Sequence, residues 1–403
     1  MQTYTYTARD VKTGDNVSAE VQADSEAAAA KLLVSRGLAP LNIKVKEPPT
    51  SFASFRNRIP TKEKVVFSRQ LSTLINSGVP LVQSLNTVRG QTGNAALKEI
   101  TGQIIADVEA GSTLAKAMSK HPKVFDNVYV SLIAAGETSG NLDVSLDRLA
   151  NQQEKDAEIV SKVRGALVYP LMVLFVLFGV LVFMLIAVLP PIQSIYEQLP
   201  GARLPLITRG LLSISNFIIS VWWLVLLVVT IGGTVLYRWT RSNSGKEVVD
   251  ELKLRLWPVR NLFSKLYMAR FSRTAATLVG SGVPIIKMLD TTAQAVGNIQ
   301  IARSITKAAE QVKGGKALSE SLRGDPNFPD LVPSMINVGE QSGALDDMMS
   351  KVADYYEKEV DNQIKTISTV IEPVLMIIVG ILALIIVASV LLPVYTLAGR
   401  TFI

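Results

Sequence analysis

Three long uncharged apolar runs divide an otherwise polar sequence of 403 residues. A helix needs roughly 20 apolar residues to cross a bilayer, and each run is at least that long. The pattern therefore predicts three transmembrane helices, at 167–190, 211–237 and 372–398. The segments that follow the first and third of these helices, 191–210 and 399–403, are then expected to be an external loop and an external tail.

The polar segments before and between the apolar runs have the periodicity of amphipathic helices. Leu97, Ile104 and Val108, for example, fall on a single stripe. Residues 61–165 are predicted to form a bundle of roughly six short helices, and residues 238–371 a second bundle.

The first 46 residues have a different pattern. Tyr4 and Tyr6 alternate with threonines, as in a half-buried strand, and an Ala-rich stretch ends at Gly37. Residues 1–46 are therefore predicted to be a small ββαβ module, joined by a Pro-containing linker at 47–60. The predicted fold class is an all-α membrane protein with two helical bundles, three transmembrane helices and a small N-terminal α+β module.

The two predicted bundles repeat each other. Phe-Ser-Arg at Phe67 recurs 204 positions later at Phe271, and Gly-Glu-x-Ser-Gly at Gly136 recurs 203 positions later at Gly339. Between these landmarks both copies carry Ser-Gly-Val-Pro, which suits a helix end at the glycine and a new first turn at the proline. Such a duplication predicts two bundles of one fold, with the same backbone path at their Ser-Gly-Val-Pro corners.

The middle apolar run has no counterpart in the repeat. Without it, the second bundle would lie on the opposite side of the membrane from the first, and as an additional crossing it returns the chain to its starting side. Both bundles then face one compartment, and Lys and Arg cluster on that side of the predicted crossings. Under the positive-inside rule the N-terminus and both bundles are expected in the cytoplasm, with the C-terminus on the other side of the membrane.

Composition adds mostly exclusions. The chain has 41 Lys and Arg against 34 Asp and Glu, no Cys and one His, which excludes disulfides, thiol catalysis and multi-His metal sites. Ser244-Gly245-Lys246-Glu247 lacks the Ser/Thr that follows Lys in a phosphate loop. No catalytic motif is visible, and basic residues do not interleave with aromatics. We therefore expect no enzyme activity, no cofactor, no metal and no nucleic-acid partner.

The doubled motifs, the three apolar runs and the N-terminal module together resemble the type II secretion system F family, the inner-membrane platform proteins of type IV pilus and type II secretion machines. The resemblance covers nearly the whole chain. It implies a non-enzymatic scaffold that couples a cytoplasmic hexameric assembly ATPase to the assembly of pilin or pseudopilin subunits. It also implies contacts with other inner-membrane machine components, the lipid bilayer and further copies of the chain.

Two other functions compete with the scaffold. A transporter or channel subunit would need polar residues within the crossings, and apart from Glu372 at the edge of the third run these hold no ionisable residue. A membrane enzyme would need a nucleophile and a base, and no such pair is visible. ATPase pull-down would support the scaffold, whereas substrate flux in proteoliposomes would support a transporter.

The Gly-Glu-x-Ser-Gly motifs are the first candidate site. In one interpretation each Glu ends a helix at a Gly turn and caps the backbone N–H groups of the next helix. In the other, the motif displays a partner contact at the tip of a helical hairpin. The residues concerned are Gly136, Glu137, Ser139, Gly140, Gly339, Glu340, Ser342 and Gly343.

The second candidate site is a hinge at Pro170, Glu372 and Pro373, where the polar bundles meet the apolar runs. In one interpretation Pro373 occupies the first turn of a helix that begins there, and Glu372 faces the positive end of the helix dipole. In the other, a continuous helix runs through each proline, which leaves a backbone carbonyl unpaired and bends the helix. Matched bends would suit the transmission of ATPase motion as a tilt or rotation.

Overall fold

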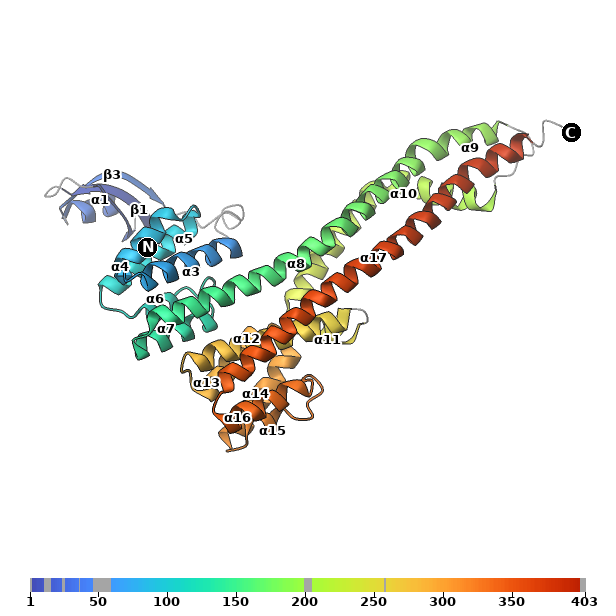
Figure 1. Ribbon diagram of the computed structural model, residues 1–403. Coiled ribbons are helices and arrows are strands. Elements are labelled where there is room, and N and C mark those ends of the chain that lie inside the picture. Colours follow the sequence, from blue (N-terminus) through green and yellow to red (C-terminus); the bar gives the residue numbers. More distant parts are fainter. Residues whose placement is uncertain are drawn as a thin grey trace. The chain divides into compact units, whose positions relative to one another are not determined.

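The computed structural model divides into two compact units, one formed by Met1–Pro60 together with Asn94–Ala96 and the other by the rest of the chain (Figure 1). The residues that it describes are 2–10, 16–23, 26–35, 37–45, 59–198, 205–256 and 259–398.

The N-terminal unit is a three-stranded antiparallel sheet with one helix. Strand β1 lies in the centre and pairs with β2 and β3 on either side. The register of β1 and β3 shifts between Thr7 and Ala8, next to Pro40, whose missing N–H suits an edge strand. Ala8 and Leu33 are fully buried. The predicted linker falls almost wholly outside the described residues. The elements are β1 Gln2–Asp10, β2 Asn16–Ala23, α1 Glu26–Ser35 and β3 Leu38–Val45.

The second unit contains both bundles, and each shows the same succession of helices. A long first helix is followed by two of medium length, a short one, another of medium length and then a very long one. The first copy consists of α3 Thr61–Asn76, α4 Leu81–Gln91, α5 Ala95–Glu109, α6 Leu114–Ser119, α7 Asn127–Ser139 and α8 Leu142–Phe183. The second consists of α12 Val259–Gly280, α13 Ile285–Ala295, α14 Ile299–Lys313, α15 Leu318–Leu322, α16 Leu331–Ser342 and α17 Leu345–Ala398.

The Ser-Gly-Val-Pro corners have the same backbone path in both copies, as the duplication predicts. Gly78 and Gly282 have φ of 80° and 79°, a left-handed conformation that glycine adopts without strain. The next N–H reaches back five residues, from Val79 to Leu74 O at 3.0 Å and from Val283 to Leu278 O at 3.0 Å, which is a Schellman helix end. The prolines, predicted in the first turn, are instead the N-cap residues, because their extended ψ of 145° and 142° precedes the helix.

The predicted boundaries between bundle and membrane at 165/167 and 371/372 are not helix boundaries. Helix α8 runs unbroken for 42 residues, and α17 for 54 residues or about 81 Å (Figure 1). The change from polar to apolar side chains marks a change of surroundings, while the backbone hydrogen bonds continue through it. The predicted loop 191–210 is also partly helical, since a short π-helix, Met184–Val188, leads from α8 into α9 at Leu189–Glu197.

Two helical stretches in the described part of the chain are long and apolar enough to cross a membrane, Leu142–Tyr196 and Leu345–Tyr395. Their apolar side chains are largely exposed, as in Phe175 and Leu384, which suits contact with lipid. The middle predicted crossing, 211–237, lies on α10, Leu206–Arg241, which departs from helical geometry at Val221. Helix α11, Asn243–Arg255, follows a break at Ser242 and was not predicted as a separate element.

Hydrogen bonds join these helices at the end far from the bundles. Ser215 on α10 donates to the carbonyl of Leu185 in the π-helix at 2.5 Å. Tyr196 on α9 donates to Pro393 O on α17 at 2.6 Å, and Thr208 on α10 donates to Ser389 O at 3.1 Å. Each is buried, so hydroxyl groups on one helix satisfy carbonyls of another where no water would reach.

Candidate functional site: the paired bundles and the cleft between them

Both Gly-Glu-x-Ser-Gly glutamates cap a helix. Glu137 accepts the backbone N–H groups of Leu114 at 2.5 Å and Ala115 at 3.0 Å. Glu340 likewise accepts those of Leu318 at 2.7 Å and Ser319 at 3.3 Å. The predicted cap therefore exists, but on another helix. The capped helices are α6 and α15, whose first residues precede the motif by more than 20 positions, because the hairpin folds the motif back onto their N-termini.

The other residues of the motif shape the same turn. Gly140 and Gly343 have φ of 73° and 71° and end α7 and α16 in the left-handed conformation. A Cβ on Gly136 would lie 2.6 Å from Ser145, and one on Gly339 would lie 2.8 Å from the Leu345 backbone, so both glycines permit close packing against the next helix. Ser139 and Ser342 donate to carbonyls one turn back. The motif is thus explained by packing and capping, while a partner contact there stays untested.

The Phe-Ser-Arg motifs carry a contact that the sequence analysis missed. Arg69 on α3 reaches α8, where it meets Glu154 at 2.6 Å and Asp147 at 2.8 Å. Arg273 on α12 meets Glu357 at 2.7 Å and Asp354 at 2.5 Å on α17. Burial opposes the charge on Arg273, yet the carboxylate hydrogen bonds outweigh it and raise its pKa.

These arginine clusters link the first helix of each bundle to the long helix that leaves it. The acceptors also follow the repeat. Glu154 and Glu357 are 203 positions apart, and so are Asp354 and Asn151, whose Oδ1 accepts from Arg69 at 2.5 Å. That offset is the signal that could have identified them before the structure. The second cluster is the more enclosed, with Arg273 and Glu357 side chains 18% and 14% exposed against 33% and 41% for Arg69 and Glu154.

The serine of each Phe-Ser-Arg motif is buried, and here the copies differ. The Ser68 hydroxyl donates to Lys64 O at 2.9 Å, which leaves it able to accept from Tyr129 Oη at 3.1 Å. Burial raises the pKa of the Tyr129 hydroxyl well above its usual value. In the second copy Val332 stands at the position of Tyr129, and the Ser272 hydroxyl has no hydrogen-bond partner among the described residues.

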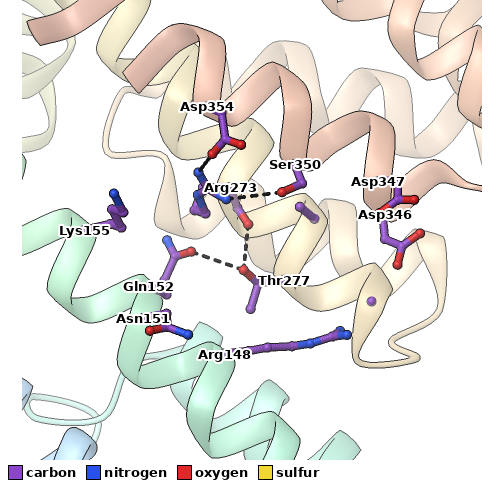
Figure 2. Close-up of a pocket in the computed structure, with 12 residues that line it drawn as sticks. Arg148, Asn151, Gln152, Lys155, Arg273, Thr277, Asp346, Asp347, Ser350 and Asp354 are labelled. Carbon is purple, nitrogen blue, oxygen red and sulfur yellow. Dashed lines mark hydrogen bonds and ion pairs between the residues drawn. The ribbon is translucent and has the colours of Figure 1, made fainter. Parts of the chain in front are cut away.

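A polar cleft of about 340 Å³ lies where α8 meets the second bundle. Figure 2 shows Gln152 pointing from α8 toward Thr277 on α12, and Arg273 pointing toward Asp354 and Ser350 on α17. Thr277 donates to Gln152 Oε1 at 3.3 Å, and Gln152 donates to Thr274 at 3.4 Å. These buried side chains fix α8 of the first bundle against α12 of the second.

Charged and apolar contacts continue this junction toward the apolar runs. Lys162 pairs with Asp361 at 2.6 Å. Beside this pair, one buried cluster joins α8, α12 and α17, and its members are Ile159, Leu262, Val360 and Ile364. The two long helices therefore leave the bundles held together. Motion of one bundle against the other would have to break this junction.

The candidate hinge residues all lie inside continuous helices. Pro170 is buried within α8, whereas Pro373 and the neighbouring Glu372 are exposed within α17. Placing Pro373 in the first turn of a helix was wrong, because α17 begins at Leu345, 28 residues earlier. The other interpretation, a helix that continues through the proline, is the one observed.

The chemistry offered by this part of the chain is that of protein contact and mechanical linkage. Among the described residues there is no group of three or more His, Asp or Glu side chains placed to hold a metal ion. The bundle junction contains ionic and polar contacts, since Asp361 pairs with Lys162, and Asp156 lies 4.0 Å from Arg270 and accepts from Gln152.

Comparison with known proteins gives matches over nearly the whole chain. The family profile described as type II secretion system (T2SS), protein F matches twice, at residues 67–190 and 271–393. Its N-terminal domain profile matches residues 1–44. The two starts are 204 positions apart and the two ends 203 apart, which confirms the duplication read from the motifs.

Three relatives match along almost their full length. The type IV pilus assembly protein PilC of Thermus thermophilus is 40% identical over 99% of both chains. The type IV pilus assembly protein TapC of Aeromonas hydrophila is 34% identical over 95% of this chain and 93% of the relative. The type II secretion system protein F of the same organism is 32% identical over 93% and 98%.

Proposed function

The chain belongs to the family of type II secretion system protein F, and on this premise we propose that it is the inner-membrane platform protein of a type IV pilus or type II secretion machine. In this role it couples a cytoplasmic hexameric assembly ATPase to the assembly of pilin or pseudopilin subunits. The protein supplies no chemistry of its own and acts by transmitting movement.

The observation that carries the proposal is the continuity of α8 and α17. Each starts within a helical bundle and extends, without a break, into an apolar stretch fit to cross a membrane. Arg69 and Arg273 attach the first helix of each bundle to these rods. A force on either bundle would therefore reach the membrane through one stiff helix.

The proposed topology has three crossings, the middle one on α10, with both bundles in the cytoplasm and the C-terminus outside. Support comes from the duplication, because only an additional crossing returns the second bundle to the side of the first. Arg238 and Arg241 at the end of α10 suit a cytoplasmic end. Reporter fusions after Asp156 and after Lys313 should report the cytoplasm, and a fusion after Gly201 should report the outside.

The function is tested by complementation and co-purification in the source bacterium. Deleting the chain should abolish pili or secretion, and restoring it should restore them. Affinity purification of the complementing protein should recover the assembly ATPase. Unimpaired pili and secretion in the deletion strain would contradict the proposal, and substrate flux in proteoliposomes with no ATPase recovered would favour a transporter instead.

A further inference from the structure

Helix α11 has an exposed apolar stripe that its own bundle does not cover. Val248, Leu252 and Leu256 are spaced four residues apart, so they lie on one face, with Leu256 at the C-cap. Their exposed fractions are 48%, 48% and 49%. The apolar stripe of a helix on a globular protein normally faces the core. This stripe points away from the core, so it needs apolar surroundings other than the bundle.

Polar contacts on the opposite face fix how α11 is turned. Asp250 is 8% exposed and accepts the Ile299 backbone N–H through Oδ2 at 3.2 Å. Its backbone carbonyl accepts from Asn298 Nδ2 at 3.1 Å, so α11 is attached to the start of α14. Residues two positions apart on a helix are about 200° apart around its axis, so Val248 and Leu252 face away from α14. The bundle therefore holds the stripe outward.

Helix α11 begins where α10 ends, next to two aromatic side chains. Ser242 has an extended ψ of 159°, which ends α10, and its hydroxyl caps α11 by accepting from Gly245 N at 3.1 Å. A Cβ on Gly245 would collide with the Trp239 carbonyl, so the first turn of α11 lies against the last turn of α10. Tyr237 and Trp239 are 57% and 44% exposed, and such aromatics are typical of the headgroup level of a membrane. With α10 as a crossing, α11 therefore starts at the membrane surface.

The charge around the stripe is positive. Residues 238–260 contain six Lys and Arg against three Asp and Glu. Arg238 and Arg241 are exposed in the last turn of α10. Arg255 stands at the edge of the stripe, and its side chain is 78% exposed although it pairs with Glu251 at 2.7 Å. Basic residues beside an apolar helix face are the pattern of a helix that lies in the headgroup layer of an anionic bilayer.

We propose that α11 lies in the plane of the cytoplasmic membrane surface, with its apolar stripe between anionic phospholipid headgroups and Arg238 and Arg241 on their phosphates. The stripe lies outside the repeat, whose matched segments begin at residues 67 and 271. Only the second bundle would then be seated on lipid, which fixes its height and tilt against the bilayer and leaves the first bundle free of this constraint. This placement requires the proposed crossing of α10, but it does not require coupling to an ATPase.

Spin labels on single cysteines test the placement in the full chain, because the chain has no cysteine of its own. Leu252→Cys labels the stripe, and Lys246→Cys labels an exposed position about 200° around α11 from Val248. Val229→Cys labels the middle of α10, where the residue is 67% exposed. In nanodiscs that contain phosphatidylglycerol, accessibility to oxygen relative to a water-soluble nickel chelate rises with depth in lipid. We expect this ratio to be several-fold higher at Leu252→Cys than at Lys246→Cys, and highest at Val229→Cys.

The three labels separate failure of this proposal from failure of the topology. A ratio at Leu252→Cys no higher than at Lys246→Cys, with a high ratio at Val229→Cys, would overturn the lipid contact of α11 and leave the crossing intact. A low ratio at Val229→Cys would overturn the crossing itself, and the placement of α11 with it. A Leu252→Cys label shielded from both reagents would mean that protein covers the stripe, which also contradicts the proposal.

The part played by charge is tested with the same Leu252→Cys label. Exchanging phosphatidylglycerol for phosphatidylcholine should lower its ratio, and so should salt at about 1 M, where the Debye length is about 3 Å. Arg238→Gln with Arg241→Gln should lower it in phosphatidylglycerol nanodiscs. Lys313→Gln with Lys316→Gln, an exposed basic pair of the same bundle, should leave it unchanged. A ratio that ignores lipid charge, salt and the arginine substitutions would overturn the attraction to anionic lipid.

Discussion

The two arginine clusters offer a matched pair of substitutions inside one chain. Arg69→Met and Arg273→Met each remove the guanidinium and keep an apolar stem of similar length, so packing along the helix is retained. They differ in what they leave behind. After Arg273→Met, the Glu357 side chain is only 14% exposed, and Lys155 at 4.0 Å is the nearest remaining cation. After Arg69→Met, Asp147 and Glu154 are 43% and 41% exposed and are rehydrated by water.

The expected costs follow from this burial. Removing one partner of a buried pair costs about 3–5 kcal/mol, and Lys155 brings the expected value for Arg273→Met to about 3 kcal/mol. An exposed pair is worth up to about 1 kcal/mol, which is the expected value for Arg69→Met. At roughly 1.4 kcal/mol per factor of ten, these costs correspond to amide exchange about 150-fold and about fivefold faster.

Hydrogen exchange measured by mass spectrometry, on the full chain in lipid nanodiscs, provides the assay. The amides to follow are those of α12 in the Arg273 variant and of α3 in the Arg69 variant, because each arginine attaches that helix to its long partner. An equal effect, or a larger one for Arg69→Met, would refute the reasoning from burial. An accelerated exchange confined to the substituted bundle is expected in both cases.

Three further predictions concern the repeat and the membrane helices. Glu340→Ala should lower the melting temperature in detergent more than Glu137→Ala does, because Thr113 still caps α6 by accepting from Lys116 N, whereas Ala317 offers α15 no side-chain cap. Loss of a cap typically costs about 1 kcal/mol of stability, and ATPase co-purification should be unchanged for both variants. The raised pKa of Tyr129 means that the folded state disfavours the phenolate, so its stabilisation is present below the unfolded pKa of about 10 and is lost as pH rises above it. Alkaline pH should then speed amide exchange in the first bundle, and Tyr129→Phe should reduce that acceleration there; the second bundle should keep its own alkaline response, because burial also raises the pKa of Tyr267 and of Tyr356. The double variant Pro170→Ala, Pro373→Ala should preserve membrane insertion and ATPase binding but reduce pili or secreted protein, because each proline removes a backbone hydrogen bond at which a long helix could bend. Normal assembly at normal protein levels would exclude the hinge.

Features that depend on local chemistry were predictable from the sequence. The Ser-Gly-Val-Pro corner needs a left-handed residue, which glycine provides, and then a residue that cannot continue the helix. Both copies satisfy this need identically at Gly78 and Gly282. The long apolar runs likewise reveal a surface that must avoid water, wherever the helices that carry them begin and end.

Features that depend on tertiary context were not predictable in the same way. The Glu137 side chain caps α6, which is distant in sequence, so its spacing to the following helix suggested the wrong partner. The change from polar to apolar at 165/167 suggested a helix boundary that the continuous backbone of α8 does not have. The acceptors for Arg69 and Arg273 lie some 80 residues further along the chain, and only the offset between the copies relates the two sets.

Breaking the long helices tests the central claim, transmission of force from bundle to membrane, most directly. Three glycines inserted after Val163 in α8 would interrupt the rod between the bundle and its apolar stretch, because glycine costs a helix roughly 1 kcal/mol per residue. The same insertion after Ser242, where α10 already ends, serves as the control. The α8 insertion should abolish pili or secretion while ATPase co-purification and membrane insertion persist, and the control should assemble normally. Normal assembly with the α8 insertion would contradict transmission of force through this helix.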